Sequence, residues 1–69
     1  MDIVTDNGYY CREDWDCDGS QASITVYDNP QEENYLGELY GYSLSQFENE
    51  DGTYDLERLD EVIIDELNL

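Results

Sequence analysis

The chain has 69 residues and contains 19 Asp or Glu, two Arg, no Lys and no His, so its formal net charge is −17. This length predicts one domain with a small core, and the charge repels anionic lipid and makes direct nucleic-acid binding unfavourable. Without His or Lys the chain lacks the usual general bases, imidazole metal ligands and amine nucleophiles. We therefore expect neither an enzyme nor a cofactor.

The composition nevertheless favours a folded protein. Hydrophobic residues make up 39% of the chain and aromatic residues 13%, which is enough to build a core where the local periodicity is clear. The N-terminus has no basic segment followed by an apolar one, and no run of about 18 apolar residues occurs. We therefore expect a cytoplasmic protein with no membrane partner.

The first part of the chain, residues 1–27, predicts a hairpin, an acidic loop and a strand. Asn7-Gly8 lies between two short runs that contain β-branched and aromatic residues. This pattern is a strong signal for a two-residue type I′ hairpin turn. The acidic loop then extends from Glu13 to Ser20.

The strand at the end of this part is predicted by strict alternation in "ASITVYD". Ile24 and Val26 lie on one face, and Thr25 and Tyr27 on the other. Alternation of this kind is typical of a half-buried strand with one face on the core.

A second alternating run, residues 35–45, predicts the antiparallel partner of that strand. The connection before it, residues 29–34, contains the single Pro and several polar residues. The alternation holds if Gly37 and Gly41 are bulges or points of close backbone approach.

The last segment, residues 53–67, predicts a helix with Thr53 as its N-cap. One apolar stripe recurs at helical spacing and consists of Leu56, Leu59, Ile63 and Leu67. The sequence as a whole therefore predicts an α+β fold, in which a small antiparallel sheet of three or four strands carries one C-terminal helix.

The outer face of this helix carries a ladder of like charges. Glu57, Glu61 and Asp65 stack four residues apart, with only Arg58 nearby to relieve the repulsion. Carboxylates spaced by about 6 Å along a helix form a row of negative charge that resembles a nucleic-acid backbone. Such a row can occupy a basic DNA-binding cleft and offer carboxylates to Lys and Arg side chains.

We predict that the partner-binding site consists of this ladder and the acids of the predicted loops. Its residues are Glu57, Glu61, Asp65, Asp14, Asp16, Asp18, Glu32, Glu33, Glu48, Glu50 and Asp51. The predicted partner is the basic DNA-binding surface of another protein. The sequence leaves open whether the chain is a monomer or a homodimer.

The segment "DWDCDG" provides an alternative. Asp14, Asp16, Asp18 and Gly19 match the first half of a calcium-binding loop. The twelfth position of such a loop holds a bidentate Glu, whereas this chain has Thr25 there, inside a predicted strand. A calcium-binding module that uses the three aspartates therefore stays an alternative function.

The two cysteines do not form a zinc motif. Cys11 and Cys17 are separated by five residues, and the chain contains no further Cys or His ligand. The spacing permits a local disulfide, whereas a reducing compartment favours two free thiols. We expect at least one of them to pack as a small hydrophobic residue.

In size and charge, this Lys-free domain resembles the DNA-mimic inhibitors of phages and mobile elements, which include many anti-CRISPR proteins. The segment "NYLGELYGYSL" is also similar to a strand segment of the antirestriction family ArdA, through Gly37, Glu38, Leu39, Gly41 and Tyr42. ArdA proteins are much longer dimers, so the likeness covers about a dozen residues.

The resemblance implies a protein that acts in the cytoplasm of an infected or host bacterial cell and blocks a DNA-binding site. The implied target is the site where a CRISPR effector complex, first of all a type I complex, reads the PAM or takes up target duplex. A further alternative is an antitoxin or immunity protein whose acids cover a basic toxin.

Overall fold

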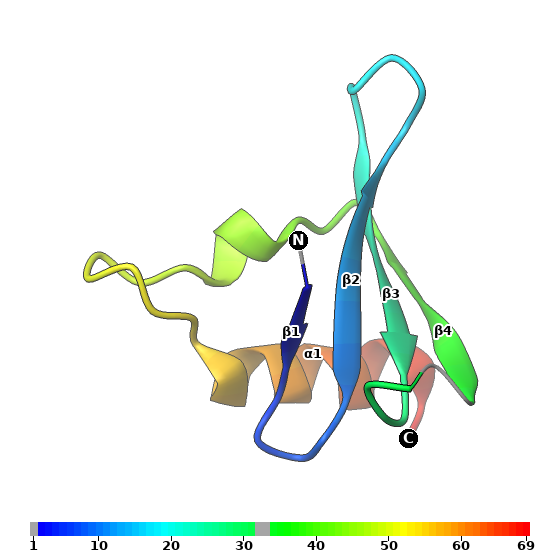
Figure 1. Ribbon diagram of the computed structural model, residues 1–69, viewed down its shortest axis with the longest axis vertical. Coiled ribbons are helices and arrows are strands. Elements are labelled where there is room, and N and C mark those ends of the chain that lie inside the picture. The colour runs from blue at the N-terminus through cyan, green and yellow to red at the C-terminus, as the bar shows by residue number, and fades with distance from the viewer. Residues whose placement is uncertain (1, 32–33) are drawn as a thin grey trace.

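A computed structural model describes residues 2–31 and 34–69, which form a sheet of four strands with one helix packed on it (Figure 1). The elements are β1 (Asp2–Val4), β2 (Tyr10–Trp15), β3 (Ala22–Tyr27), β4 (Tyr35–Tyr40), the short 3₁₀-helix η1 (Leu44–Phe47) and α1 (Leu56–Leu67). The strands pair antiparallel in the order β1-β2-β3-β4. The predicted α+β fold with one C-terminal helix is therefore confirmed.

The first hairpin forms where Asn7-Gly8 predicts it, but its turn is different. Gly8 N–H donates to the Thr5 carbonyl over 3.0 Å, and Thr5 N–H donates to the Tyr9 carbonyl over 2.9 Å. Gly8 has a φ of +91°, whereas Asn7 does not have a positive φ. A type I′ turn needs positive φ at both central residues, so the prediction of a two-residue type I′ turn was wrong.

Strand β2 continues further into the acidic segment than predicted. Glu13 and Asp14 belong to β2, so the connection to β3 consists of residues 16–21. Glu13 fits in the strand because its carboxylate accepts hydrogen bonds from Leu44 N–H (2.7 Å) and from the indole N–H of Trp15 (3.1 Å). These partners satisfy a half-buried charge that would otherwise destabilise the pairing.

Strand β4 carries the predicted irregularity at Gly37. The register between β3 and β4 shifts after Val26, which is paired with Gly37. A Cβ atom added to Gly37 would lie 2.7 Å from Cδ2 of Leu67, so the missing side chain lets the end of α1 approach the sheet.

The predicted strand at residues 35–45 is too long, because β4 ends at Tyr40. Gly41 follows with a φ of +80°, a conformation that glycine adopts without steric cost. The chain then forms η1, whose Leu44 and Phe47 side chains are buried. The apolar residues after Gly41 therefore contribute to the core from a helix.

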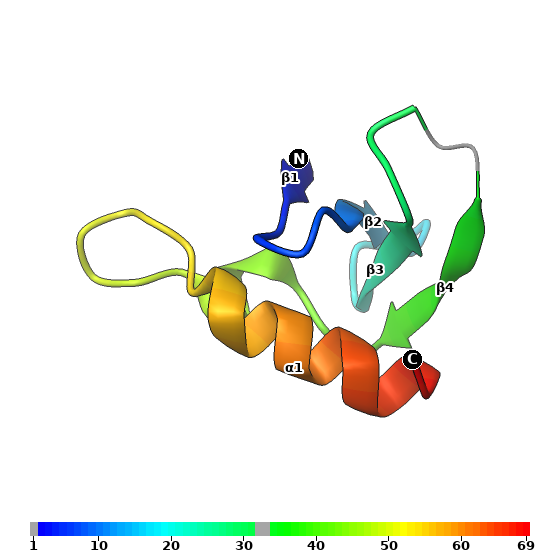
Figure 2. The same cartoon turned by 90° about the horizontal axis from the view of Figure 1, so that it is seen from below.

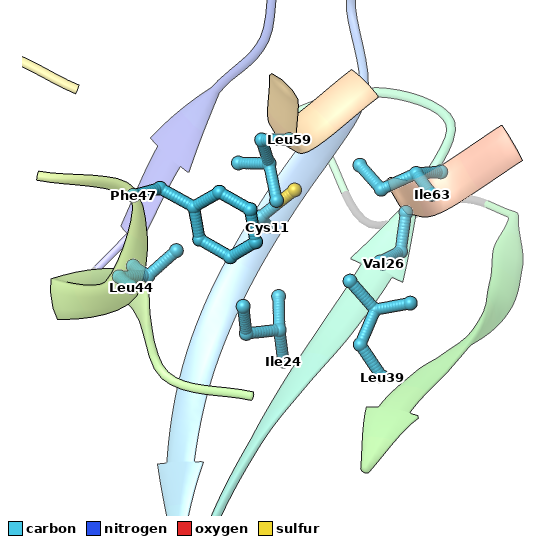
Figure 3. Close-up of a cluster of buried hydrophobic side chains, with 8 residues drawn as sticks. All are labelled: Cys11, Ile24, Val26, Leu39, Leu44, Phe47, Leu59 and Ile63. Atoms are coloured by element: carbon cyan, nitrogen blue, oxygen red, sulfur yellow. The ribbon is translucent and has the colours of Figure 1, made fainter. Parts of the chain in front are cut away.

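The hydrophobic core lies between the sheet, η1 and α1 (Figures 2 and 3). Its side chains have at most 1% of their surface exposed and are Cys11, Ile24, Val26, Leu39, Leu44, Phe47, Leu59 and Ile63. Leu56 and Leu67 are half-buried and complete the predicted stripe of α1. Figure 2 shows α1 along one face of the sheet. The alternation of the strands directs their other side chains to the opposite face.

The helix begins later than predicted, at Leu56, and its N-cap is Asp55. The Asp55 carboxylate accepts a hydrogen bond from Arg58 N–H over 3.1 Å. Thr53, the predicted cap, instead donates through its hydroxyl (2.6 Å) and its backbone N–H (3.0 Å) to the Asp51 carboxylate. The prediction of Thr53 as the cap was therefore wrong.

The cap can be tested by substitution. Asp55→Ala removes the acceptor for Arg58 N–H and is expected to lower the free energy of unfolding by about 1 kcal/mol. Asp55→Asn is the matched control, because Asn is an equally good cap without a charge, and it should keep most of the stability. Urea unfolding followed by circular dichroism measures both changes. Equal losses in the two variants would attribute the effect to charge and contradict the cap.

Candidate functional site

The predicted ladder on α1 is exposed to solvent. Glu57, Glu61 and Asp65 are exposed, and they lie on the side of the helix away from the buried residues Leu59 and Ile63. Their spacing of four residues places successive carboxylates about 6 Å apart along the helix axis. The helix thus presents a short row of negative charge to solvent.

The acids around the β2–β3 connection are held by hydrogen bonds to their neighbours. The Asp14 carboxylate, in β2, accepts from the Thr25 hydroxyl over 2.8 Å. At the tip, one oxygen of Asp18 accepts from the hydroxyl (2.7 Å) and the backbone N–H (3.0 Å) of Ser20. These two bonds, the hydroxyl first, lower the pKa of Asp18. Asp16 is exposed beside it.

These positions do not fit the calcium loop that "DWDCDG" predicts. Within the ranges 2–31 and 34–69, no three Asp, Glu, Cys or His side chains are grouped so that they could hold a metal ion. Asp14 lies in an extended strand, and Thr25, at the twelfth position, lies in β3 and is bonded to it. The geometry therefore gives the calcium alternative no support.

A third group of acids lies in the segment between η1 and α1. Glu48, Glu50 and Asp51 are exposed there. Asp51 accepts from the Thr53 hydroxyl and backbone N–H, and these bonds, the hydroxyl first, lower the pKa of the Asp51 carboxyl. The predicted site residues Glu32 and Glu33 lie outside the described residues.

The three groups of acids occupy different parts of the molecule. In Figure 1 the β2–β3 connection lies at the top, the segment between η1 and α1 extends to the left, and α1 crosses the bottom. The predicted site residues are therefore spread around the domain. A flat binding surface on a partner can contact one or two of these groups at a time.

The sheet face opposite α1 carries a row of tyrosines that the sequence analysis did not single out. The ring centroids of Tyr10 and Tyr27 are 6.0 Å apart, and those of Tyr27 and Tyr35 are 5.9 Å apart. The Tyr10 hydroxyl donates to Asp2 over 2.7 Å, and the Tyr35 hydroxyl donates to Glu38 over 3.3 Å. Each of these tyrosines comes from a different strand, and the register pairs Tyr10 with Tyr27 and Tyr27 with Tyr35, so no local sequence pattern could have shown the row.

Asp60 is the exception among the described acids, because it is buried, with 6% of its surface exposed. One of its oxygens accepts from Asn7 N–H over 3.3 Å, while the other has no hydrogen-bond partner. Its place follows from helical spacing, since Asp60 lies one turn after Leu56 and directly follows the buried Leu59. A buried, half-satisfied carboxylate is destabilising.

The two cysteines are both free thiols, Cys11 in the core and Cys17 exposed in the β2–β3 connection. The local disulfide that their spacing permits is therefore absent. Burial, and secondly the nearby Asp60 charge, raise the pKa of Cys11 from 9.0 to about 12. Cys11 thus acts as a small core residue and not as a nucleophile.

No family model, curated protein or solved structure matches the chain. Within the described part of the chain, no helix combines the length and the apolar character that crossing a bilayer requires. The candidate site therefore rests on the geometry given above.

Thiol labelling distinguishes the two cysteines. Iodoacetamide at neutral pH should modify Cys17 in the folded protein and leave Cys11 intact, because the thiolate is the reactive form and Cys11 is buried with a raised pKa. Mass spectrometry of proteolytic fragments measures each site, and both should react in denaturant. Native labelling of Cys11 as fast as that of Cys17 would contradict the packing described here.

Alkaline pH provides a second test of Cys11. Because its pKa is raised to about 12 in the fold, its contribution to stability is complete below pH 9 and is lost between pH 9 and about 12. The free energy of unfolding of the wild type should fall more steeply over this range than that of Cys11→Ala. The free energy of unfolding is measured with urea between pH 8 and 11. If it fell equally steeply in the wild type and in Cys11→Ala, the Cys11 thiol would not contribute to the pH dependence of stability.

Proposed function

We propose that this chain is an inhibitor that presents a DNA-like row of carboxylates to the basic DNA-binding site of another protein. The observation that carries this proposal is the exposed ladder of Glu57, Glu61 and Asp65 in a chain without Lys or His. Arg58 is the cationic residue near the ladder. Its guanidinium lies 5.3 Å from the centroid of the Phe47 ring, so its side chain is directed toward η1. The carboxylates of the ladder repel one another, and cations that bind between them relieve this repulsion.

The spacing of the ladder suits a site built for phosphates. Successive carboxylates are about 6 Å apart along α1, within a factor of two of the 3.4 Å rise per phosphate along one DNA strand. Lys and Arg side chains that bind phosphates also bind carboxylates, and Arg does so in a bidentate manner. Association through such contacts is fast and weakens steeply with salt.

The partner that we propose first is a CRISPR effector complex of type I. The size and charge of the chain resemble those of anti-CRISPR proteins, and a PAM-recognising subunit presents a basic groove to duplex DNA. A protein that occupies this groove prevents target binding without reading any base. Since the ladder, the β2–β3 acids and the acids after η1 lie apart, we assign the groove contact to the ladder.

The direct test is competition with DNA. The tagged protein captures a purified type I complex, and a PAM-containing duplex is then added at constant ionic strength, with an equal mass of neutral dextran as the control. Elution by the duplex alone is the expected result, because both ligands need the same basic site. Capture that excess duplex leaves unchanged would contradict the proposal.

Charge reversal locates the contact. Glu61→Lys combined with Asp65→Lys is expected to slow association with the partner by about tenfold or more. The variant should stay folded, because a Lys at position 61 gains Glu57 as an oppositely charged neighbour four residues before it, and a Lys at position 65 lies in the last turn of α1, where the helix dipole favours a cation. Surface plasmon resonance gives the rates.

The matched control for this variant is Glu48→Lys combined with Glu50→Lys. It changes the net charge by the same amount at exposed positions away from α1. The control should retain most of the binding. Equal losses in both variants would mean that net charge alone matters and that the ladder is not the contact.

A further inference from the structure

β4 forms one edge of the sheet, because it pairs with β3 on one side only. Neither Figure 1 nor Figure 2 shows a described segment beyond β4 on the side away from β3. The other edge strand, β1, has three residues, whereas β4 has six. β4 therefore provides the longer open edge of the sheet.

The pairing pattern identifies the backbone groups that face this open side. Gly41 N–H donates to the Ala22 carbonyl over 3.1 Å, so these two residues form a hydrogen-bonded pair. Such pairs alternate with non-hydrogen-bonded pairs along an antiparallel ladder, and Tyr40 and Glu38 occupy the non-hydrogen-bonded positions. Their backbone N–H and C=O groups therefore point away from β3. Among residues 2–31 and 34–69, no backbone hydrogen bond outside the ladders involves these two residues.

The sequence of β4 leaves its edge unprotected. Natural edge strands are commonly blocked by Lys, by Pro or by a bulge. β4 contains neither Lys nor Pro, and the shift of register lies before Gly37. Residues 37–40 are therefore a regular stretch along which a further strand can pair.

The side chains beside these backbone groups are a carboxylate and two aromatic rings. Tyr35, Glu38 and Tyr40 lie on the sheet face opposite α1. Tyr35 has 57% of its surface exposed and Tyr40 has 77%, whereas Glu38 is half-buried between them. The Tyr35 hydroxyl donates to the Glu38 carboxylate over 3.3 Å. A strand laid along β4 would therefore meet a negative charge flanked by two rings.

We propose that β4 is a docking edge that accepts an extended segment of a basic protein as a fifth strand of the sheet. The backbone N–H and C=O groups of Glu38 and Tyr40 bind the segment. In strand addition of this kind, main-chain hydrogen bonds provide affinity and alternate side chains provide specificity. The docking edge is distinct from the ladder on α1, so the proposal does not depend on mimicry of DNA.

Charge complementarity selects a basic segment. Glu38 is the one charged side chain of β4, and the two Arg of the chain are Arg12 in β2, separated from β4 by β3, and Arg58 in α1. A Lys or Arg beside Glu38 forms a cross-strand ion pair, and β-branched side chains two positions away pack on the rings of Tyr35 and Tyr40. The net charge of −17 attracts such a segment and repels an acidic one.

A short peptide tests both parts of this recognition. The labelled peptide Gly-Val-Thr-Lys-Thr-Val-Gly, with blocked ends, is titrated with the protein at physiological salt and followed by fluorescence anisotropy. One control has Glu in place of Lys, and a second has methylated backbone N–H groups but the same charge. Both controls should bind at least about tenfold more weakly, because one loses the ion pair and the other loses backbone donors. A methylated peptide that binds as tightly as the unmethylated one would overturn the proposal.

Amide exchange measured by NMR locates the bound peptide. In the free protein, the N–H groups of Glu38 and Tyr40 should exchange quickly because they face water, and saturation with the Lys peptide should slow both by about tenfold or more. The N–H of Leu39 is the internal control, because it faces β3 and should change less. Unchanged exchange at Glu38 and Tyr40 would place the peptide elsewhere and contradict the docking edge.

Two substitutions at one position separate charge from hydrogen bonding. Glu38→Gln removes the charge and should weaken peptide binding by about 2- to 5-fold. Glu38→Pro also removes the outward N–H and should weaken binding by a further factor of about 2 to 10. An edge strand accepts Pro where the N–H faces water, and Gly37 before it has no Cβ to clash with the ring. Equal binding by the two variants would count against strand addition, and amide exchange of the wild type gives the decision if the Pro variant does not fold.

A second copy of the chain is the competing occupant of the edge. Repulsion between two chains of charge −17 opposes that pairing, so the protein alone should sediment as a monomer. A dimer in which the Glu38 and Tyr40 amides are protected without peptide would replace the proposal with self-pairing. Displacement of the protein from its partner by duplex DNA is measured separately. If the Lys peptide fails to bind but DNA still displaces the protein, the docking edge is wrong and the inhibitor proposal stands.

Discussion

Self-repulsion among carboxylates is the constraint under which this domain folds, because a net charge of −17 opposes a small core, which among the described residues has eight fully buried apolar side chains. The fold meets it by keeping most acids in water and by giving the less exposed ones hydrogen-bond donors. The half-buried Glu13 carboxylate accepts from Leu44 N–H and the Trp15 indole N–H, and the exposed Asp14 also accepts from the Thr25 hydroxyl. Asp60 is the exception, because one oxygen of its buried carboxylate has no hydrogen-bond partner.

The elements that could be predicted are those with a clear period. Alternation placed Ile24 in the core, and helical spacing placed Leu59 there, so the strand and helix faces followed from the sequence. The first residue of the helix could not be predicted from the sequence, because Thr53 and Asp55 are both good N-cap residues. Asp55 N–H donates to the Phe47 carbonyl over 2.6 Å, a contact between segments that no local pattern contains. The extension of β2 likewise depends on a contact between Glu13 and η1, far apart in the sequence.

The candidate site also has one part that could be predicted from the sequence and one part that could not. The ladder of Glu57, Glu61 and Asp65 was predictable because it needs only the helical period. The row of tyrosines was not, because Tyr10, Tyr27 and Tyr35 come from three strands whose register no local pattern fixes.

The open edges of the sheet give the acidity a second consequence. β1 and β4 are the edge strands, and β4 carries the exposed rings of Tyr35 and Tyr40 with Glu38 between them. An edge with exposed aromatic rings is a template for strand addition by another copy of the chain. Long-range repulsion between copies opposes this pairing and is screened over about 8 Å at physiological ionic strength. The carboxylates therefore oppose strand pairing between copies of the chain, and protonation of the carboxylates in acid or screening by salt weakens this opposition.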